Sequence, residues 1–260
     1  MKRDTWVVVG AVALIVLLAG IYTLTGVGMS MSALQMTRMA GPIGEPMAMS
    51  MSLEWTWGYA TLVFFMWWIM MIAMMTPSAA PTLLLFTALK RHGSESASAT
   101  ELSFLFLSGY LIVWGGFSLL AMGAQWAFEA IGVVNGPMMT LASRVMAGCV
   151  LILAGLYQFS TFKAACLKQC SSPAQFLTQH RRKGRLGALQ TGMRHGYFCF
   201  GCCWALMALL FVGGIMNLYW IVGLALYVLV EKIVPYPKAI TFTSGGLLLA
   251  GGLWCVVTAF

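Results

Sequence analysis

The sequence predicts an all-α fold: a polytopic transmembrane helix bundle that forms one membrane domain over residues 1–260. The 260 residues are 60% hydrophobic and 8% charged, and the mean hydropathy is +0.87. A soluble domain is about 45–50% apolar and about 25% charged. The apolar residues form blocks of about 20, the length of a helix that crosses a bilayer core. Barrel strands are about half as long and alternate in polarity, so we expect helices and exclude soluble enzymes.

Apolar runs bounded by charged or turn residues define seven expected spans. They are Trp6–Leu24, Trp55–Met75, Leu102–Met122, Met138–Phe159, Tyr197–Met216, Leu218–Val234 and Ala239–Ala259. The first span is expected to remain as an uncleaved anchor, because its uninterrupted apolar run exceeds the core of a usual signal peptide.

The basic residues predict the orientation of the bundle. With the N-terminus inside, all of the 15 Lys and Arg residues except Arg38 and Arg144 fall in cytoplasmic segments, as the positive-inside rule requires. We therefore expect a multi-pass protein of the bacterial inner membrane with a cytoplasmic N-terminus and a periplasmic C-terminus. Residues 25–54 form a periplasmic loop and residues 160–196 a basic cytoplasmic loop. The net charge of +8 then faces anionic lipid of the bilayer, and no nucleic acid is expected as a partner.

Charged residues and prolines interrupt the apolar blocks at a few positions. Arg144 is expected inside the fourth span, and Glu231 and Lys232 are expected to reach the inner interface. Pro77 and Pro81 lie in a block that is too long for the bilayer core. They predict either a functional break, whose backbone groups need protein or water as partners, or a tilted helix with a kink.

The periplasmic loop is rich in methionine. Its seven methionines are Met29, Met31, Met36, Met39, Met47, Met49 and Met51. Thioether sulfur is a soft ligand that selects Cu(I). The closely spaced residues Met29, Met31, Met47, Met49 and Met51 are therefore candidate ligands of an entry site. The alternative is an adaptable contact surface for lipid or a partner protein, which methionine also provides.

A second group of methionines follows one side of the second span. Met66, Met70 and Met74 are spaced four residues apart and share a helix face. We take Met70 and Met74 as candidate copper ligands. Ordinary packing of methionine in a membrane helix is the alternative interpretation.

Thiols and one imidazole gather near the cytoplasmic ends of two spans. Cys166 and Cys170 are one helical turn apart, whereas His195, Cys199, Cys202 and Cys203 occupy neighbouring positions on another helix. This set of residues suits Cu(I) as the expected metal, with zinc as the second choice. A dithiol redox pair and inert buried cysteines are the alternatives.

These segments resemble the DUF2182 family of predicted metal-binding integral membrane proteins. The resemblance rests on MMIAMMTPSAAP at Met70–Pro81, GLYQ at Gly155–Gln158 followed by KAACLKQC at Lys163–Cys170, and GMRHG with CFGCCW between Gly192 and Trp204. It spans roughly residues 54–232. It implies an inner-membrane protein linked with metal handling, especially copper. It also implies a metal site at Cys166, Cys170, His195, Cys199, Cys202 and Cys203.

The sequence thus predicts a copper-handling membrane protein, either a permease or a chaperone, and leaves open whether it is an enzyme. We expect it to collect Cu(I) at periplasmic methionines and to present it to thiolates on the cytoplasmic side. Its expected partner is a copper-dependent membrane enzyme or a copper chaperone. Two other functions stay open: a structural or assembly subunit of a membrane oxidase or monooxygenase, and a membrane thiol oxidoreductase. Against the oxidoreductase, the sequence has no Cys-x-x-Cys motif in a thioredoxin-like context.

Overall fold

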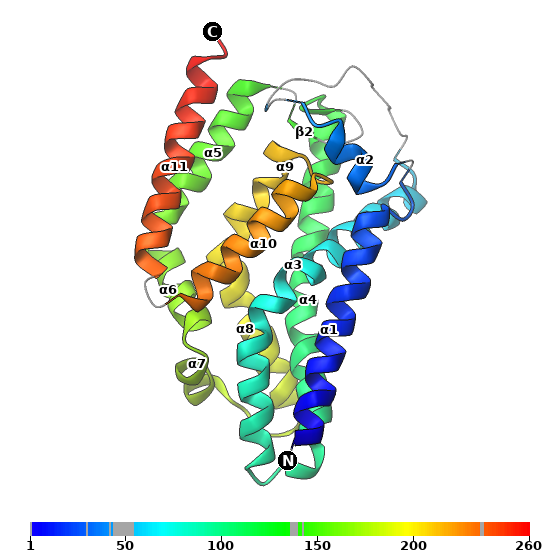
Figure 1. The fold of residues 1–260 in the computed structure, drawn as a ribbon, viewed down its shortest axis with the longest axis vertical. Helices are drawn as coiled ribbons and strands as arrows, with labels where there is room; N and C mark the ends of the chain where they lie inside the picture. The colour runs from blue at the N-terminus through cyan, green and yellow to red at the C-terminus, as the bar shows by residue number, and fades with distance from the viewer. Residues whose placement is uncertain are drawn as a thin grey trace.

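The protein is a bundle of long helices with a two-stranded ribbon at one end (Figure 1). The computed structural model describes residues 2–29, 31–41, 43, 55–135, 140–141, 143–234 and 237–260. Its helices are α1 Lys2–Thr25, α2 Ala33–Arg38, α3 Trp57–Arg91, the 3-10 turn η1 Ser96–Ser98, α4 Ala99–Ala130, α5 Arg144–Gln158, α6 Thr161–Ser171, α7 Pro173–His180, α8 Gly184–Ala208, α9 Leu210–Gly213, α10 Leu218–Ile233 and α11 Pro237–Val257. The strands β1 Val134–Asn135 and β2 Thr140–Leu141 pair antiparallel.

Each of the seven expected spans overlaps a helix, but the helices differ in length. Within the described residues, five helices are long and apolar enough to cross a membrane: α1, α3, the run of η1 and α4, the run of α8 and α9, and α11. Helices α5 and α6 together form a sixth candidate span if they are treated as one helix with a bend. Helix α10 has only 16 residues, fewer than the roughly 20 that a bilayer core requires. Hence the chain is a multi-pass membrane protein, whereas seven spans and their orientation stay predictions.

Helix α8 lies at the centre of the bundle, and α1 and α11 lie on opposite flanks (Figure 1). In the most apolar stretch of α8, 72% of the residues are buried, against 17% in α1 and in α11. The termini lie at opposite ends of the bundle (Figure 1). Residues that face inward from α8 are therefore shielded from lipid as well as from water.

Glycine at Gly192 allows α4 to lie directly against α8. A Cβ atom at Gly192 would come within 3 Å of three backbone atoms of Phe106 on α4. Small residues at helix contacts let backbones approach in this way in membrane proteins. The close crossing brings the side chains of α8 next to those of α4.

Helix α3 runs without interruption through both of its prolines, so of the two alternatives the functional break is not present. The helix is 35 residues long, about 52 Å at 1.5 Å per residue. It therefore extends well beyond a bilayer core, as the tilted-helix alternative expected. Its ribbon changes direction along its length (Figure 1), as is usual for a helix that contains proline.

The real break lies between α5 and α6, where the chain bends by 66°. Ser160 caps α6, because its hydroxyl accepts a hydrogen bond from the Lys163 amide at 3.1 Å. A serine cap of this kind fixes where a helix begins. The bend directs α6 against α8, and it places Lys163 in the first turn of α6, inside the bundle.

Candidate functional site

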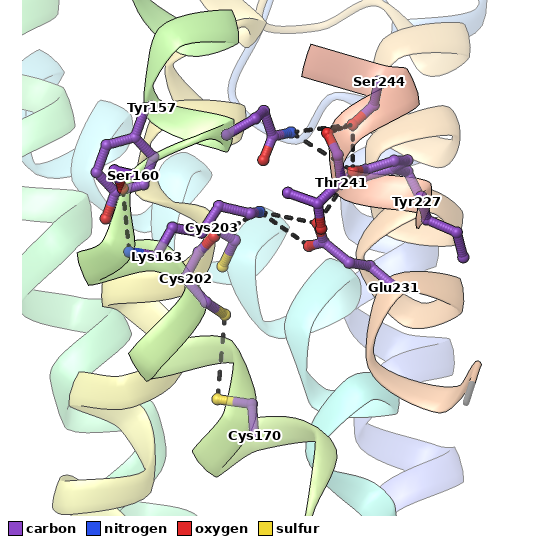
Figure 2. A network of polar contacts seen from close by, with 12 residues as sticks. Tyr157, Ser160, Lys163, Cys170, Cys202, Cys203, Tyr227, Glu231, Thr241 and Ser244 are labelled. Atoms are coloured by element: carbon purple, nitrogen blue, oxygen red, sulfur yellow. Dashed lines mark hydrogen bonds and ion pairs between the residues drawn. The ribbon is translucent and has the colours of Figure 1, made fainter. Parts of the chain in front are cut away.

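Five reduced cysteines lie buried where α6 packs against α8. They are Cys166, Cys170, Cys199, Cys202 and Cys203. The sulfur atoms of Cys170 and Cys202 are 4.0 Å apart (Figure 2). The thiols of Cys202 and Cys203 donate to the backbone carbonyl of Cys199 at 3.1 and 2.8 Å. The structure thus brings together the two cysteine groups that the sequence predicted to converge.

Gly201 determines how closely α6 approaches α8. A Cβ atom at this position would lie 2.7 Å from the sulfur of Cys166, so any larger residue would displace that side chain or α6. The hydroxyl of Tyr157 donates a hydrogen bond to the Gly201 carbonyl, which fastens the end of α5 to the same turn of α8. Gly201 and Tyr157 therefore set the spacing between the two thiol groups.

A buried lysine faces the thiols from α10. The ammonium nitrogen of Lys232 lies 2.9 Å from the sulfur of Cys199 and 2.9 Å from the hydroxyl oxygen of Ser78 on α3. The hydroxyl of Tyr110 lies 3.1 Å from the same sulfur. The sulfur of Cys199 therefore contacts polar groups from two other helices, α10 and α4.

The expectation that Glu231 and Lys232 reach the inner interface is wrong. Glu231 has no exposed surface and Lys232 is only 6% exposed, because both side chains point into the bundle toward partners on other helices. Charges inside a membrane segment are expensive and usually functional. Two adjacent charges in the apolar sequence of Leu218–Ile233 were the signal that could have identified this part of the site.

Glu231 forms a buried ion pair with Lys163 (Figure 2). The ammonium nitrogen of Lys163 is 2.9 Å from one carboxylate oxygen of Glu231, and it also donates to the carbonyl of Cys202 at 2.9 Å. The hydroxyls of Tyr227 and Thr241 donate to the Glu231 carboxylate at 3.0 and 2.9 Å. A buried ion pair persists only when such additional hydrogen bonds satisfy its remaining atoms, and this one ties α6, α8, α10 and α11 together.

His195 is a buried polar side chain that lacks hydrogen-bond partners. It is 1% exposed, and neither ring nitrogen has a hydrogen bond to any residue that the structure describes. The rings of Phe106, Tyr110 and Phe176 surround it at centroid distances of 5.9, 5.6 and 5.0 Å. Buried polar atoms without partners are rare and call for an explanation, such as a ligand that is not present in the structure.

The methionines divide into three groups. Met66, Met70 and Met74 are buried along α3. Met29 lines a cavity of about 10 Å³ together with Met66 and Met216, whereas Met31 is partly buried and packs against the core. Met47, Met49 and Met51 lie outside the described residues. The structure thus joins Met29 to the methionines of α3, and it adds Met216, which the sequence analysis missed because it lies far away in the chain.

Two of the buried thiols are close enough to share one ion. With metal–thiolate bonds of about 2.3 Å, two sulfurs on the same ion lie about 3.8 Å apart in a tetrahedral arrangement and about 4.6 Å apart on opposite sides of the ion. The 4.0 Å between Cys170 and Cys202 lies between these values. Across the described part of the chain, no three His, Cys, Asp or Glu side chains are arranged to hold a metal ion, so the arrangement offers a pair of soft ligands.

Together, these features define a multi-pass helical membrane protein with a buried cluster of thiols at the contact of α6 and α8. Residues 64–255 match the model of the PpoB2 family, which is described as a copper chaperone. The match covers most of the chain, so the protein belongs to this family. The match confirms the expected link with copper. It does not name the DUF2182 family, so that resemblance still rests on the sequence motifs alone. No curated protein and no solved structure matches the chain.

Proposed function

We propose that this protein is a membrane-embedded copper chaperone that holds Cu(I) between the thiolates of Cys170 and Cys202. The observation that carries the proposal is the 4.0 Å separation of these two sulfurs in a member of a copper chaperone family. Thiolate sulfur selects Cu(I) over harder ions. Cys166, Cys199, Cys203 and His195 are further donors within the same packed region.

Cu(I) reaches the thiols along the methionines of α3. The periplasmic loop, including Met31, Met47, Met49 and Met51, collects the ion and passes it to Met29. The cavity that Met29 shares with Met66 and Met216 supports this entry point, and the buried series Met66, Met70 and Met74 continues it inward. Thioethers bind Cu(I) without losing a proton, so the ion can move between them before thiolates capture it.

The bundle spans the bacterial inner membrane with its basic loops in the cytoplasm. The thiol site then lies toward the cytoplasmic side and receives copper from the periplasm. A copper-dependent membrane enzyme or a second chaperone is the partner that accepts the ion.

Anaerobic Cu(I) titration of the purified full-length protein tests the proposal. The protein should bind Cu(I) stoichiometrically. Cys170→Ser and Cys202→Ser should each weaken binding by more than the roughly 10–100-fold that loss of an outer-shell partner costs. Cys149→Ser is the matched control, because Cys149 is an exposed thiol on α5. Unchanged affinity in both site variants, or no binding by the parent protein, would overturn the proposal.

A membrane thiol oxidoreductase is the second candidate, and the same pair of sulfurs favours it. A disulfide requires an S–S distance of about 2.05 Å, which Cys170 and Cys202 would reach after a small movement. Trapping of a mixed disulfide through Cys170 or Cys202, without any binding of Cu(I), would support this function in place of the first.

A further inference from the structure

We propose that Lys232 selects the charge of the ion that the thiol site accepts, so that a monovalent ion is favoured over a divalent one. This inference rests on the proposed function, because it takes the thiolates of Cys170 and Cys202 as the ligands. It deepens that function by assigning the preference for Cu(I) to a residue that does not touch the ion.

The position of Lys232 supports this role. Its ammonium group contacts the sulfur of Cys199 and the hydroxyl of Ser78, each at 2.9 Å. Cys199 and Cys202 are three residues apart on α8 and therefore lie on the same face of that helix. The side chain of Lys232 is 6% exposed, so water screens its charge little.

No carboxylate neutralises Lys232 within the described residues. The neighbouring Glu231 is directed to Lys163, with oxygen–nitrogen distances of 2.9 and 3.0 Å. The same carboxylate accepts hydrogen bonds from Tyr227 and Thr241. The Lys163–Glu231 pair is therefore neutral as a unit, and the positive charge of Lys232 needs an anionic partner at the thiols.

The charge of the occupied site then depends on the ion. Whichever thiols are deprotonated, a divalent ion brings one more positive charge into the site than a monovalent ion does. The ammonium of Lys232, which lies 2.9 Å from the sulfur of Cys199, repels this additional charge, and such a repulsion is strong where little water screens it. Lys232 therefore favours the monovalent ion.

Competition titrations with Ag(I) and Zn(II) test this inference. Ag(I) serves as a monovalent soft ion that does not change oxidation state, and Zn(II) as the divalent ion. Lys232→Met should lower the ratio of Ag(I) affinity to Zn(II) affinity by about tenfold or more, because one unit charge a few ångströms away is removed. A purely structural role would weaken both ions together. Lys232→Arg, which keeps the charge, should retain the preference of the parent protein.

Two further variants make the result decisive. Ser78→Asp places a carboxylate beside Lys232 and neutralises its charge, so it should reduce the preference for Ag(I) over Zn(II). This variant provides the test if Lys232→Met does not fold. Lys238→Met is the control, because Lys238 is an exposed lysine at the start of α11, and the preference should not change.

The outcomes separate the inference from the proposed function. If the parent protein binds neither ion at Cys170 and Cys202, the proposed function is wrong. If it binds Ag(I) there but the ratio of affinities is the same in Lys232→Met or Ser78→Asp, the charge role of Lys232 is wrong and the proposed function stands.

Discussion

Lys163 and Glu231 form an ion pair in which neither side chain has exposed surface, with an ammonium–carboxylate distance of 2.9 Å. The two residues belong to α6 and α10, so the pair holds the bent segment of the chain to a helix that follows much later in the sequence. Because Lys163 also donates to the Cys202 carbonyl, the pair connects the position of α6 directly to the thiols of α8.

Removal of either charge should destabilise the protein strongly. We expect Lys163→Met and Glu231→Gln each to cost about 3–5 kcal/mol, because each leaves an uncompensated buried charge. The double variant should recover part of that loss, since neither charge then remains. Thermal unfolding of the detergent-solubilised protein, analysed as a double-mutant cycle, measures the coupling. Additive effects of the two substitutions would contradict the importance of the pair.

Gly201 should tolerate no side chain. Gly201→Ala places a Cβ atom 2.7 Å from the sulfur of Cys166, and we expect it to push α6 away from α8 at a cost of about 1–3 kcal/mol. The affinity for Cu(I) should fall as well, because Cys170 moves with α6. Gly223→Ala is the control, because a Cβ atom there has no neighbour within 4 Å. Normal stability and Cu(I) binding in Gly201→Ala would show that the close approach is unnecessary.

His195 should be more important for copper than for folding. Since neither ring nitrogen has a partner among the described residues, His195→Phe removes an unsatisfied polar group whose burial costs about 1–3 kcal/mol. The copper-free variant should therefore unfold at the same temperature as the parent protein or higher. Its affinity for Cu(I) should be lower, because the imidazole is one of the proposed donors, and an unchanged affinity would exclude it as a ligand. A large loss of stability without copper would instead indicate a structural role for the histidine.

The methionines of α3 should affect loading and not final affinity. Replacing Met66, Met70 and Met74 with leucine conserves packing, since such exchanges usually cost less than about 1.5 kcal/mol each, but it removes the thioether ligands. Cu(I) should reach the thiols several-fold more slowly from the outer face of proteoliposomes, with unchanged equilibrium binding. Met146→Leu, at an exposed position of α5, should load at the normal rate. If the triple leucine variant loads Cu(I) as fast as Met146→Leu, the methionines of α3 are not the route.

Glu95 should make the connection before α8 sensitive to pH. Its carboxylate accepts from Lys90 at 2.5 Å and from the Gly184 amide at 2.6 Å. These hydrogen bonds, with that from Lys90 as the largest cause, lower the pKa of Glu95 below its ordinary value of 4.5. The charged form is favoured in the folded state, so its stabilisation is present above pH 4.5 and is lost as pH falls through the lower folded pKa.

Amide exchange at Gly184 measures this effect. Protection of the Gly184 amide should decrease as the pH is lowered through the titration of Glu95, after correction for the intrinsic exchange rate. In Glu95→Gln the protection should be weaker and independent of pH over the same range. A pH-dependent loss of protection that persists in Glu95→Gln would assign the titration to another group.

The sequence by itself determined the helices and their approximate positions. Apolar blocks such as Trp6–Leu24 correspond to α1 because hydropathy and helical hydrogen bonding are local properties of the chain. It also determined which thiols are candidates, because Cys199, Cys202 and Cys203 lie close together along one helix. The link with copper, expected from these sulfur atoms, agrees with the family to which the chain belongs.

Only the tertiary structure decided which side chains meet. The contact of Cys170 with Cys202, the ion pair of Lys163 with Glu231 and the position of Lys232 beside Cys199 all join residues more than 30 positions apart in the chain. Such contacts depend on the bend after α5 and on the close approach at Gly201, and neither can be read from hydropathy. The sequence placed Lys232 at an interface because a lone charge avoids lipid, whereas its partners on other helices make a buried position stable.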